Sequence, residues 1–342
     1  MAIHIDNSIL RTTARCDTEV TLRYIHDYTA ADEAAPLKSG IAGHEALATY
    51  FRGGTPAEAL SVLETMYKQW ADEHVPSDDR LAYPNVHAVV AAWLESHPIN
   101  QLPFQVPGPE FVEVGFQYPL DDHGDIIFTG RMDLTVRDMD GDLAPMDHKY
   151  TGRIDKFWIA NFKNDSQMTG YMWVAGQHYG KRLLKGYVNA IELSQLPTDP
   201  TRKCRLHAVP YAECGEQHGR SALILINRTP QQLEEWRRTA LKLARRYIAL
   251  RDKYGSDLDL LHRVAMQGTF HQACSRCSFA HFCTNGRPIA MLDTVLRKEH
   301  WDPLAHAMGG HSRHERDTPL TKPKKKAKKS SVKSTPQLES DK

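Results

Sequence analysis

The spacing of apolar residues changes near residue 110, and this change limits the fold more than any other feature of the sequence. Upstream, apolar side chains recur at helical intervals, which predicts helices at 17–30, 40–51, 55–70 and 83–96. Downstream, alternating segments joined by turn sequences rich in Asp and Gly predict strands at 111–118, 125–137 and 143–150. Helices followed by an antiparallel meander are not the pattern of a repeat protein.

The second half of the chain mixes helices and strands. A helix is predicted at 164–179, and strands are predicted at 184–193, 202–210 and 222–227. Thr229 and Pro230 then begin a long helix that continues to Tyr254, because Pro is tolerated in a first helical turn. Together these elements predict a mixed α/β or α+β sheet.

The composition is that of an ordinary globular protein. The 342 residues are 41% hydrophobic and 25% charged, enough for roughly two domains or one large domain with insertions. No apolar run approaches the ~18 residues of a membrane span, and the N-terminus shows no secretory leader. We therefore expect no membrane association and an intracellular, reducing location in which the six cysteines are not disulfide-bonded.

The charge is distributed unevenly although the net charge is only +1. The tail from Thr321 onward holds eight Lys and two acidic residues, a charge of +6, so the remainder carries −5. The tail lacks apolar periodicity, which is typical of disorder. It is expected either to bind nucleic acid through counterion release or to serve only as a solubilising tail.

Three charged residues on the second and third predicted strands form a candidate catalytic group. Asp147 and Lys149 are two residues apart and therefore share one face of a strand, and Asp133 can join them from the neighbouring strand. Paired carboxylates suit Mg²⁺ or Mn²⁺, and a nearby lysine can help to activate water. The group predicts metal-assisted hydrolysis of a phosphodiester, although a lone Asp-x-Lys is more often a surface salt bridge.

Three further residues extend this group. His44 lies in the middle of a predicted helix, where an imidazole can add a metal ligand or simply pack. Gln167 and Tyr171 are four residues apart and share a helical face, which is also compatible with ordinary packing.

The ordered set His44, Gly130-x-x-Asp133, Asp147-x-Lys149 and Gln167-x-x-x-Tyr171 resembles the RecB-type branch of the PD-(D/E)XK nuclease superfamily. The resemblance implies a restriction-endonuclease-like fold, a central mixed sheet flanked by helices. It implies that His44, Asp133 and Asp147 bind the metal and that Lys149 assists water activation. The helix with Gln167 and Tyr171 would lie beside the active site and DNA, and Glu113 stands where some members hold a further acid.

The cysteines suggest a second metal centre. Cys274-x2-Cys277-x5-Cys283 supplies three thiolates, and a cubane cluster needs four. Cys204 and Cys214 are candidates by number, but the segment Ser8–Cys16 resembles the N-terminal cysteine segment of the iron–sulfur members of this family. That resemblance implies that Cys16 completes a [4Fe–4S] site, with Zn²⁺ as the alternative metal for the same thiolates.

The resemblance divides the chain into an N-terminal helical part with Cys16 and His44 (1–110), a nuclease core with the cysteine segment (111–290) and a C-terminal extension (291–342). The chain departs from compact relatives by added helices between 53 and 109 and by Asp17 where many have Pro. It contains no P-loop, so a helicase or recombination protein would be a separate partner.

The leading hypothesis is a metal-dependent DNA exonuclease that acts in phage or bacterial recombination, repair or replication, with endonuclease activity as a further option. A CRISPR-adaptation nuclease that trims DNA ends is the first alternative, and a non-catalytic DNA-binding subunit with a relic fold is the second. The intact Asp133, Asp147 and Lys149 argue against the relic. Cleavage polarity, strand preference and oligomeric state are left open by the sequence.

Overall fold

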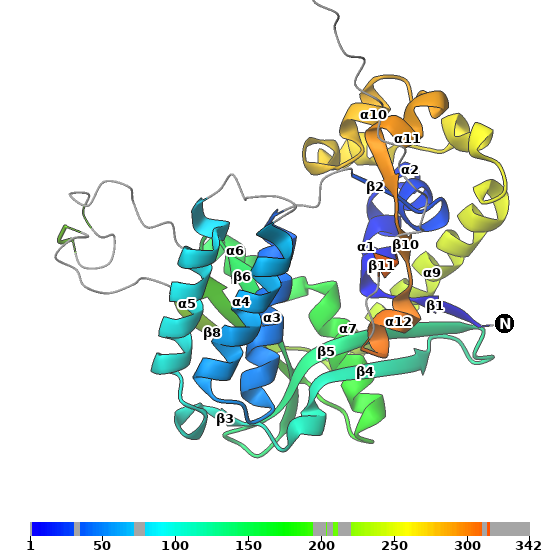
Figure 1. The fold of residues 1–342 in the computed structure, drawn as a ribbon. Helices are drawn as coiled ribbons and strands as arrows, with labels where there is room; N and C mark the ends of the chain where they lie inside the picture. Colours follow the sequence, from blue (N-terminus) through cyan, green and yellow to red (C-terminus); the bar gives the residue numbers. More distant parts are fainter. Residues whose placement is uncertain are drawn as a thin grey trace, which may run out of the picture.

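The computed structural model describes residues 2–30, 35–71, 79–193, 203, 208–210, 220–309 and 313–314. The Lys-rich tail, Cys204, Cys214 and most of the strand predicted at 202–210 lie outside these residues. Figure 1 shows a central sheet with helices on both faces and a smaller lobe above one end of it, built from the N-terminal and C-terminal parts of the described chain.

A seven-stranded mixed sheet forms the centre of the molecule. Its main path runs β1-β5-β6-β7-β8, and β3 and β4 also pair with β5. The meander β4-β5-β6 is antiparallel as predicted, whereas β1 pairs with β5 and β6 pairs with β7 in parallel. The strands are β1 (Ile3–Ile5), β3 (Phe104–Gln105), β4 (Val112–Pro119), β5 (Ile126–Asp138), β6 (Leu143–Thr151), β7 (Lys185–Glu192) and β8 (Ser221–Asn227).

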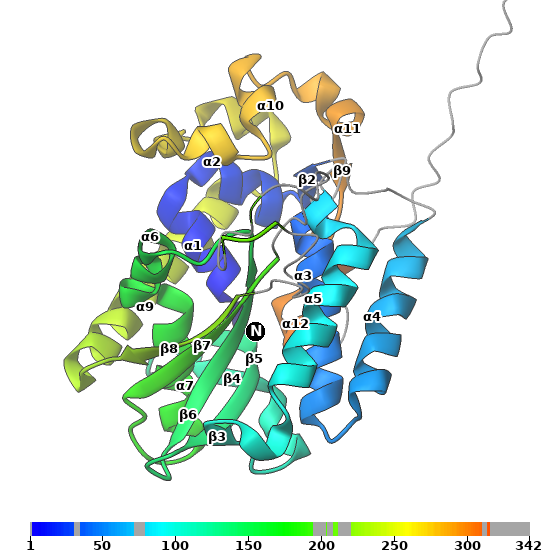
Figure 2. The same ribbon diagram turned by 90° about the vertical axis from the view of Figure 1, so that its left-hand side faces the viewer.

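Helices cover both faces of the sheet (Figure 2). One face packs against α3 (Ala35–Phe51), α4 (Pro56–Ala71) and α5 (Tyr83–Ser96). The other packs against α1 (Asn7–Arg15), α7 (Ser166–His178) and α9 (Pro230–Tyr254). The predicted fold class, a mixed sheet flanked by helices, is confirmed, and a capping box at Thr229 and Gln232 begins α9 where the Thr-Pro pair predicted it.

The N-terminal segment differs from its prediction. The helix predicted at 17–30 consists of α2 (Asp17–Val20) and a π-helical turn (Thr21–Ile25), and it ends before Asp27, whose φ of 59° is incompatible with a right-handed helix. Residues Tyr28–Ala30 then form β2, which pairs with β9 (Leu296–Lys298). Local periodicity gave no sign of β2 because its partner strand lies more than 260 residues away.

The smaller lobe has a hydrophobic core of its own. Leu22 and Tyr28 pack there against side chains from the segment after α9, including Phe279 and Phe282. This segment contains α10 (Ala280–Thr284) and α11 (Leu292–Val295). The chain then passes through β10 (His300–Trp301) to α12 (Pro303–Ala307), which packs against β4 and β5.

Short helices connect these elements. Among them are α6 (Lys156–Ala160), which follows β6, and the 3-10 turns Asn161–Asn164 and Gln267–His271. None of the helices within the described ranges is both long and apolar enough to cross a bilayer.

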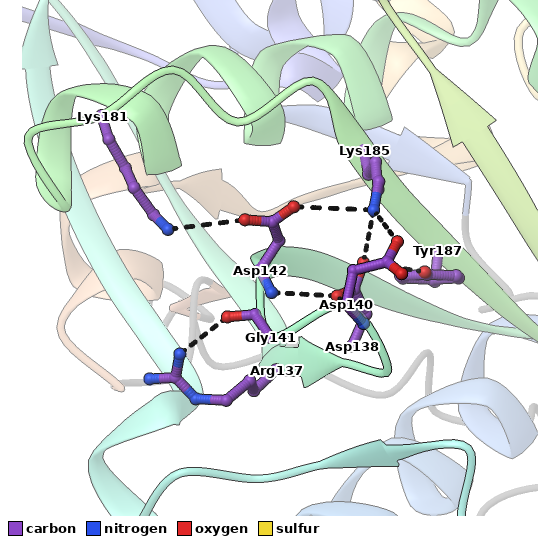
Figure 3. A network of polar contacts seen from close by, with 8 residues as sticks. All are labelled: Arg137, Asp138, Asp140, Gly141, Asp142, Lys181, Lys185 and Tyr187. Atoms are coloured by element: carbon purple, nitrogen blue, oxygen red, sulfur yellow. Dashed lines mark hydrogen bonds and ion pairs between the residues drawn. The ribbon is translucent and has the colours of Figure 1, made fainter.

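An ammonium group ties the β5–β6 turn to the start of β7 (Figure 3). Lys185 Nζ lies 3.1 Å from Asp138 and 3.6 Å from Asp142 carboxylate oxygens, and it also pairs with Asp140. Asp138 is buried and also accepts hydrogen bonds from the backbone N–H groups of Asp140 and Asp142. One cation therefore offsets the repulsion among three acids in a tight turn.

Replacing Lys185 with Met should lower the melting temperature of the protein. Although burial opposes it, hydrogen bonding to Lys185 lowers the pKa of Asp138, so this stabilisation is present above the unfolded pKa near 4. The difference in Tm between wild type and variant should therefore shrink as the pH falls below about 4. Lys181→Met, which removes a 3.9 Å contact to Asp142 alone, is the matched control and should change Tm little.

Candidate active site

Asp133 and Asp147 stand where two central strands separate. β5 and β6 pair only between Leu134–Arg137 and Leu143–Met146. Beyond that point, β6 continues beside β7, while β5 continues beside β4 and β1. The last paired residues are Leu134 and Met146, so the two aspartates come next on each strand and face each other at the fork.

The Asp133 carboxylate is held from two sides. Its Oδ2 accepts a 2.7 Å hydrogen bond from the backbone N–H of His148 on β6 and lies 3.1 Å from Nδ1 of His44 on α3. Burial alone would raise the pKa of Asp133, but the neighbouring His44 outweighs it and lowers this pKa. Asp133 is therefore an anion that already interacts with a proposed metal ligand.

A chain of polar contacts links Asp147 to the helix α7. Lys149 Nζ lies 2.6 Å from Asp147 Oδ2 and donates a 3.0 Å hydrogen bond to Gln167 Oε1. Gln167 Nε2 donates to the Tyr171 hydroxyl (2.9 Å), which donates to the carbonyl oxygen of Arg131 on β5 (2.8 Å). The four predicted residues thus form one continuous network across β6, α7 and β5.

Close packing brings α3 and its His44 to the fork. A Cβ atom on Gly43 would lie only 2.3 Å from the ring of Tyr150, so only glycine allows α3 to approach β6 this closely. The ring of His148 stacks on Phe51 of the same helix with centroids 5.5 Å apart. Gly43 is therefore required by the packing of α3 against β6, a role that is separate from the chemistry of the site.

Glu113 is a further acid at the fork, at the position where the resemblance places one in some family members. It lies on β4 beside Asp133, with a φ of 55°, a strained value for a side chain of this size. Its carboxylate pairs with Arg131 at 2.6 Å. Among the described residues, ligand atoms of His44, Glu113 and Asp133 lie within 4.8 Å of one another. Only the position of Glu113 on the strand before Asp133 hinted at this placement.

Burial disfavours the charged form of two of the carboxyl groups at the fork. Burial, reinforced by Asp133, raises the pKa of Glu113 to about 7. Burial also raises the pKa of Asp147 to about 6, and its Oδ1 has no hydrogen-bond partner among the described residues. Buried acids with an orphaned oxygen beside an imidazole are the donor set expected of a divalent cation site. The residues present therefore fit Mg²⁺ or Mn²⁺.

The four cysteines that the resemblance implies as cluster ligands, Cys16, Cys274, Cys277 and Cys283, lie together in the smaller lobe. A Cβ atom on Gly268 would lie 3.4 Å from Cys274 Sγ and 3.7 Å from Cys16 Sγ, although these cysteines are 258 residues apart. Burial raises the pKa of the Cys277 and Cys283 thiols to about 11. The charge of Cys283 also contributes to the raised pKa of Cys277, so the two side chains lie near each other. None of the four forms a disulfide.

Asp17, the residue after Cys16, is joined to the segment near the other cysteines and to α9. Its backbone N–H donates to Gln267 Oε1, and its carboxylate accepts from Gln267 Nε2 (2.7 Å) and from Arg246 on α9 (2.9 Å). The next residue, Thr18, donates from its backbone N–H to the carbonyl of Ala265. Cys16 is thereby held against the segment that carries the other three thiols.

A family model of the PD-(D/E)XK nuclease superfamily matches residues 7–284. No curated protein matches the sequence. Among solved structures, a candidate exonuclease from Eubacterium rectale is 11% identical, with a TM-score of 0.44 over 73% of this chain and 82% of that one. The protein SSO0001 is 15% identical, with a TM-score of 0.30 over 82% of this chain and 95% of that one. The matched family range contains the fork and all four converging cysteines.

Proposed function

Because this chain belongs to the PD-(D/E)XK nuclease superfamily, we propose that it is a RecB-type deoxyribonuclease that degrades DNA from its ends with Mg²⁺ or Mn²⁺. The observation that carries the proposal is the network from Asp147 through Lys149 and Gln167 to Tyr171 at the fork between β5 and β6. A relic fold would have no reason to keep a half-buried lysine between a carboxylate and an amide.

The proposed ligands are His44, Asp133 and Asp147, with Glu113 as a fourth. Bound there, a divalent cation would supply a Lewis acid for the phosphodiester and lower the pKa of a water ligand. The protein's part would be to supply oxygen and nitrogen donors to one ion. Ligand atoms of His44, Glu113 and Asp133 lie within 4.8 Å of one another, and Asp147 follows the last paired residue of β6 at the fork, which supports this proposal.

Lys149 is proposed to orient the attacking water and to offset charge on the phosphate. Burial opposes its ionisation, but Asp147 and Asp133 outweigh burial and raise the pKa of Lys149. The ammonium therefore keeps its protons and donates hydrogen bonds rather than acting as a base. Gln167 and Tyr171 are positioning residues that fix the direction of the Lys149 side chain.

Digestion of end-labelled linear DNA beside a covalently closed circle tests this proposal. We expect linear single- or double-stranded DNA to be degraded with Mg²⁺ or Mn²⁺, the circle to survive, and EDTA to stop the reaction. Lys149→Met protein, purified identically, controls for contaminating nucleases. Degradation by that variant at the wild-type rate would refute the assignment, and cleavage of the circle would replace exonuclease by endonuclease.

Metal affinity should depend on pH. Glu113 and Asp147, with pKa values raised to about 7 and 6, hold protons at low pH that a cation must displace. We expect the affinity for Mn²⁺ to fall between pH 8 and pH 5.5, approaching tenfold per unit for each proton displaced. Calorimetric titration in two buffers of different ionisation enthalpy measures proton release. Affinity independent of pH would contradict the placement of these acids at the metal.

We further propose that Cys16, Cys274, Cys277 and Cys283 hold a [4Fe–4S] cluster. The placement of Cys16 and Cys274 on the same side of Gly268, with Cys277 and Cys283 nearby, supports a shared site for the four thiols. The raised thiol pKa values agree with a site that needs bound metal to keep thiolates.

A further inference from the structure

An exposed phenylalanine projects from the segment that joins two catalytic elements. Phe157 lies on α6 and is 72% exposed to solvent. The segment leaves β6 just after Lys149 and enters α7 just before Gln167, and these two residues are hydrogen-bonded to each other. Both ends of the segment are therefore fixed at the proposed active site, and Figure 1 shows α6 at that end of β6.

The backbone beneath Phe157 is rigidly anchored. Asp155 caps α6 by accepting from the backbone N–H groups of Phe157 and Trp158. The buried Ile154 donates from its backbone N–H to Glu192 (2.8 Å), and Trp158 packs edge-on against Phe162 with centroids 4.7 Å apart. The ring is therefore presented to solvent on a fixed support, so a ligand that stacks on it need not first order the backbone.

One cation lies close to the ring, and two more are exposed on the same segment. Lys156 Nζ lies 5.1 Å from the Phe157 ring centroid, and the side chains of Arg153 and Lys163 are exposed on the same segment. Residues 153–163 contain these three cations and a single acid, Asp155, a net charge of +2. An aromatic face among cations, next to a phosphodiester-cleaving centre, matches the groups that bind an unpaired base and its backbone.

We propose that Phe157 is a stacking platform for an unpaired base of single-stranded DNA, within a few nucleotides of the scissile phosphate. Phe157 follows Lys149 by eight positions in the chain, and a fully extended chain spans at most about 3.6 Å per residue, so the two residues lie within about 29 Å of each other. The inference rests on the proposed nuclease function. It adds a preference for strands whose bases are unpaired, because a paired base has no free face to offer.

Binding of single-stranded oligonucleotides that carry 2-aminopurine at successive positions tests the platform. The Lys149→Met protein serves as the background, so that the DNA remains intact during the measurement. We expect quenching of 2-aminopurine fluorescence at one or two positions. Phe157→Ala should abolish it and weaken binding by about 5- to 100-fold, and Phe157→Trp should restore both. Phe270→Ala, which removes the even more exposed ring (87%) in the cysteine lobe, is the matched control.

Unchanged quenching in Phe157→Ala would overturn the platform, as would an equal loss in Phe270→Ala. These readouts do not need cleavage, so failure of the platform and failure of the nuclease assignment can be told apart. Cleavage by wild type without position-specific quenching refutes only the platform. Quenching without cleavage refutes only the nuclease function.

Discussion

Replacing Asp133 with Asn should abolish DNA cleavage, with a loss of at least about 10³-fold, while leaving the fold and DNA binding largely intact. The amide is nearly the same size as the carboxylate and can still accept the hydrogen bond from the His148 backbone. It cannot supply the negative charge that a divalent cation and His44 require. Rates on end-labelled DNA, with DNA affinity measured in parallel, test this expectation.

Two further variants show that such a loss would come from the site. Asp142→Asn removes a carboxylate from the β5–β6 turn at the other end of the sheet, and its cleavage should match wild type. Gln167→Leu should lower the rate by a smaller factor, about 10- to 100-fold, because it frees Lys149 without removing it. Full activity of Asp133→Asn with unchanged metal dependence would place the catalytic metal elsewhere.

The part of the site that could be predicted from sequence is the part set by local spacing. Asp147 and Lys149 share a strand face, and Gln167 and Tyr171 share a helix face, and both pairs meet in one hydrogen-bonded chain. The neighbouring strand β5 brings Asp133 because a short turn joins it to β6. A spacing of two residues on a strand and of four residues on a helix places side chains on one face, so no tertiary information is needed to predict these pairs.

The rest depends on contacts that no local pattern encodes. Glu113 joins the fork through an unusual backbone angle on β4, which the alternation of that strand does not announce. The pairing of β2 with β9 and the packing of α1 against α7 and α9 join distant segments. The exposure of Phe157 could not be predicted from the sequence either. The nearby aromatic residues Trp158 and Phe162 pack against each other, and nothing in the local sequence distinguishes Phe157 from them.

The cysteine lobe is connected to the catalytic network through α1. Cys16 directly follows this helix, and α1 packs against α7 and α9. Ser166 at the start of α7 donates to Asn7 at the start of α1, and the next residue, Gln167, holds Lys149. Any change that releases Cys16 therefore loosens a helix that supports the α7 side of the active site.

Replacing Cys16 with Ser should accordingly remove the cluster and reduce both stability and cleavage. We expect wild-type protein purified without oxygen to be brown and to carry about four irons per chain. The variant should be colourless, with a lower Tm, because the clamp that closes the long segment between Cys16 and Cys274 is lost. Iron and zinc analysis, visible absorbance and thermal unfolding measure these effects, and cleavage is measured on the same preparations.

Cys204→Ser and Cys214→Ser are the matched controls, since these cysteines lie outside the described residues and outside the proposed ligand set. Both variants should keep colour, Tm and activity. If either loses its colour while Cys16→Ser keeps it, then the fourth ligand is not Cys16. Iron-free wild-type protein with one zinc per chain would replace the cluster by a zinc site. The nuclease assignment would survive that result, because none of the four thiols belongs to the fork where Asp133 and Asp147 meet.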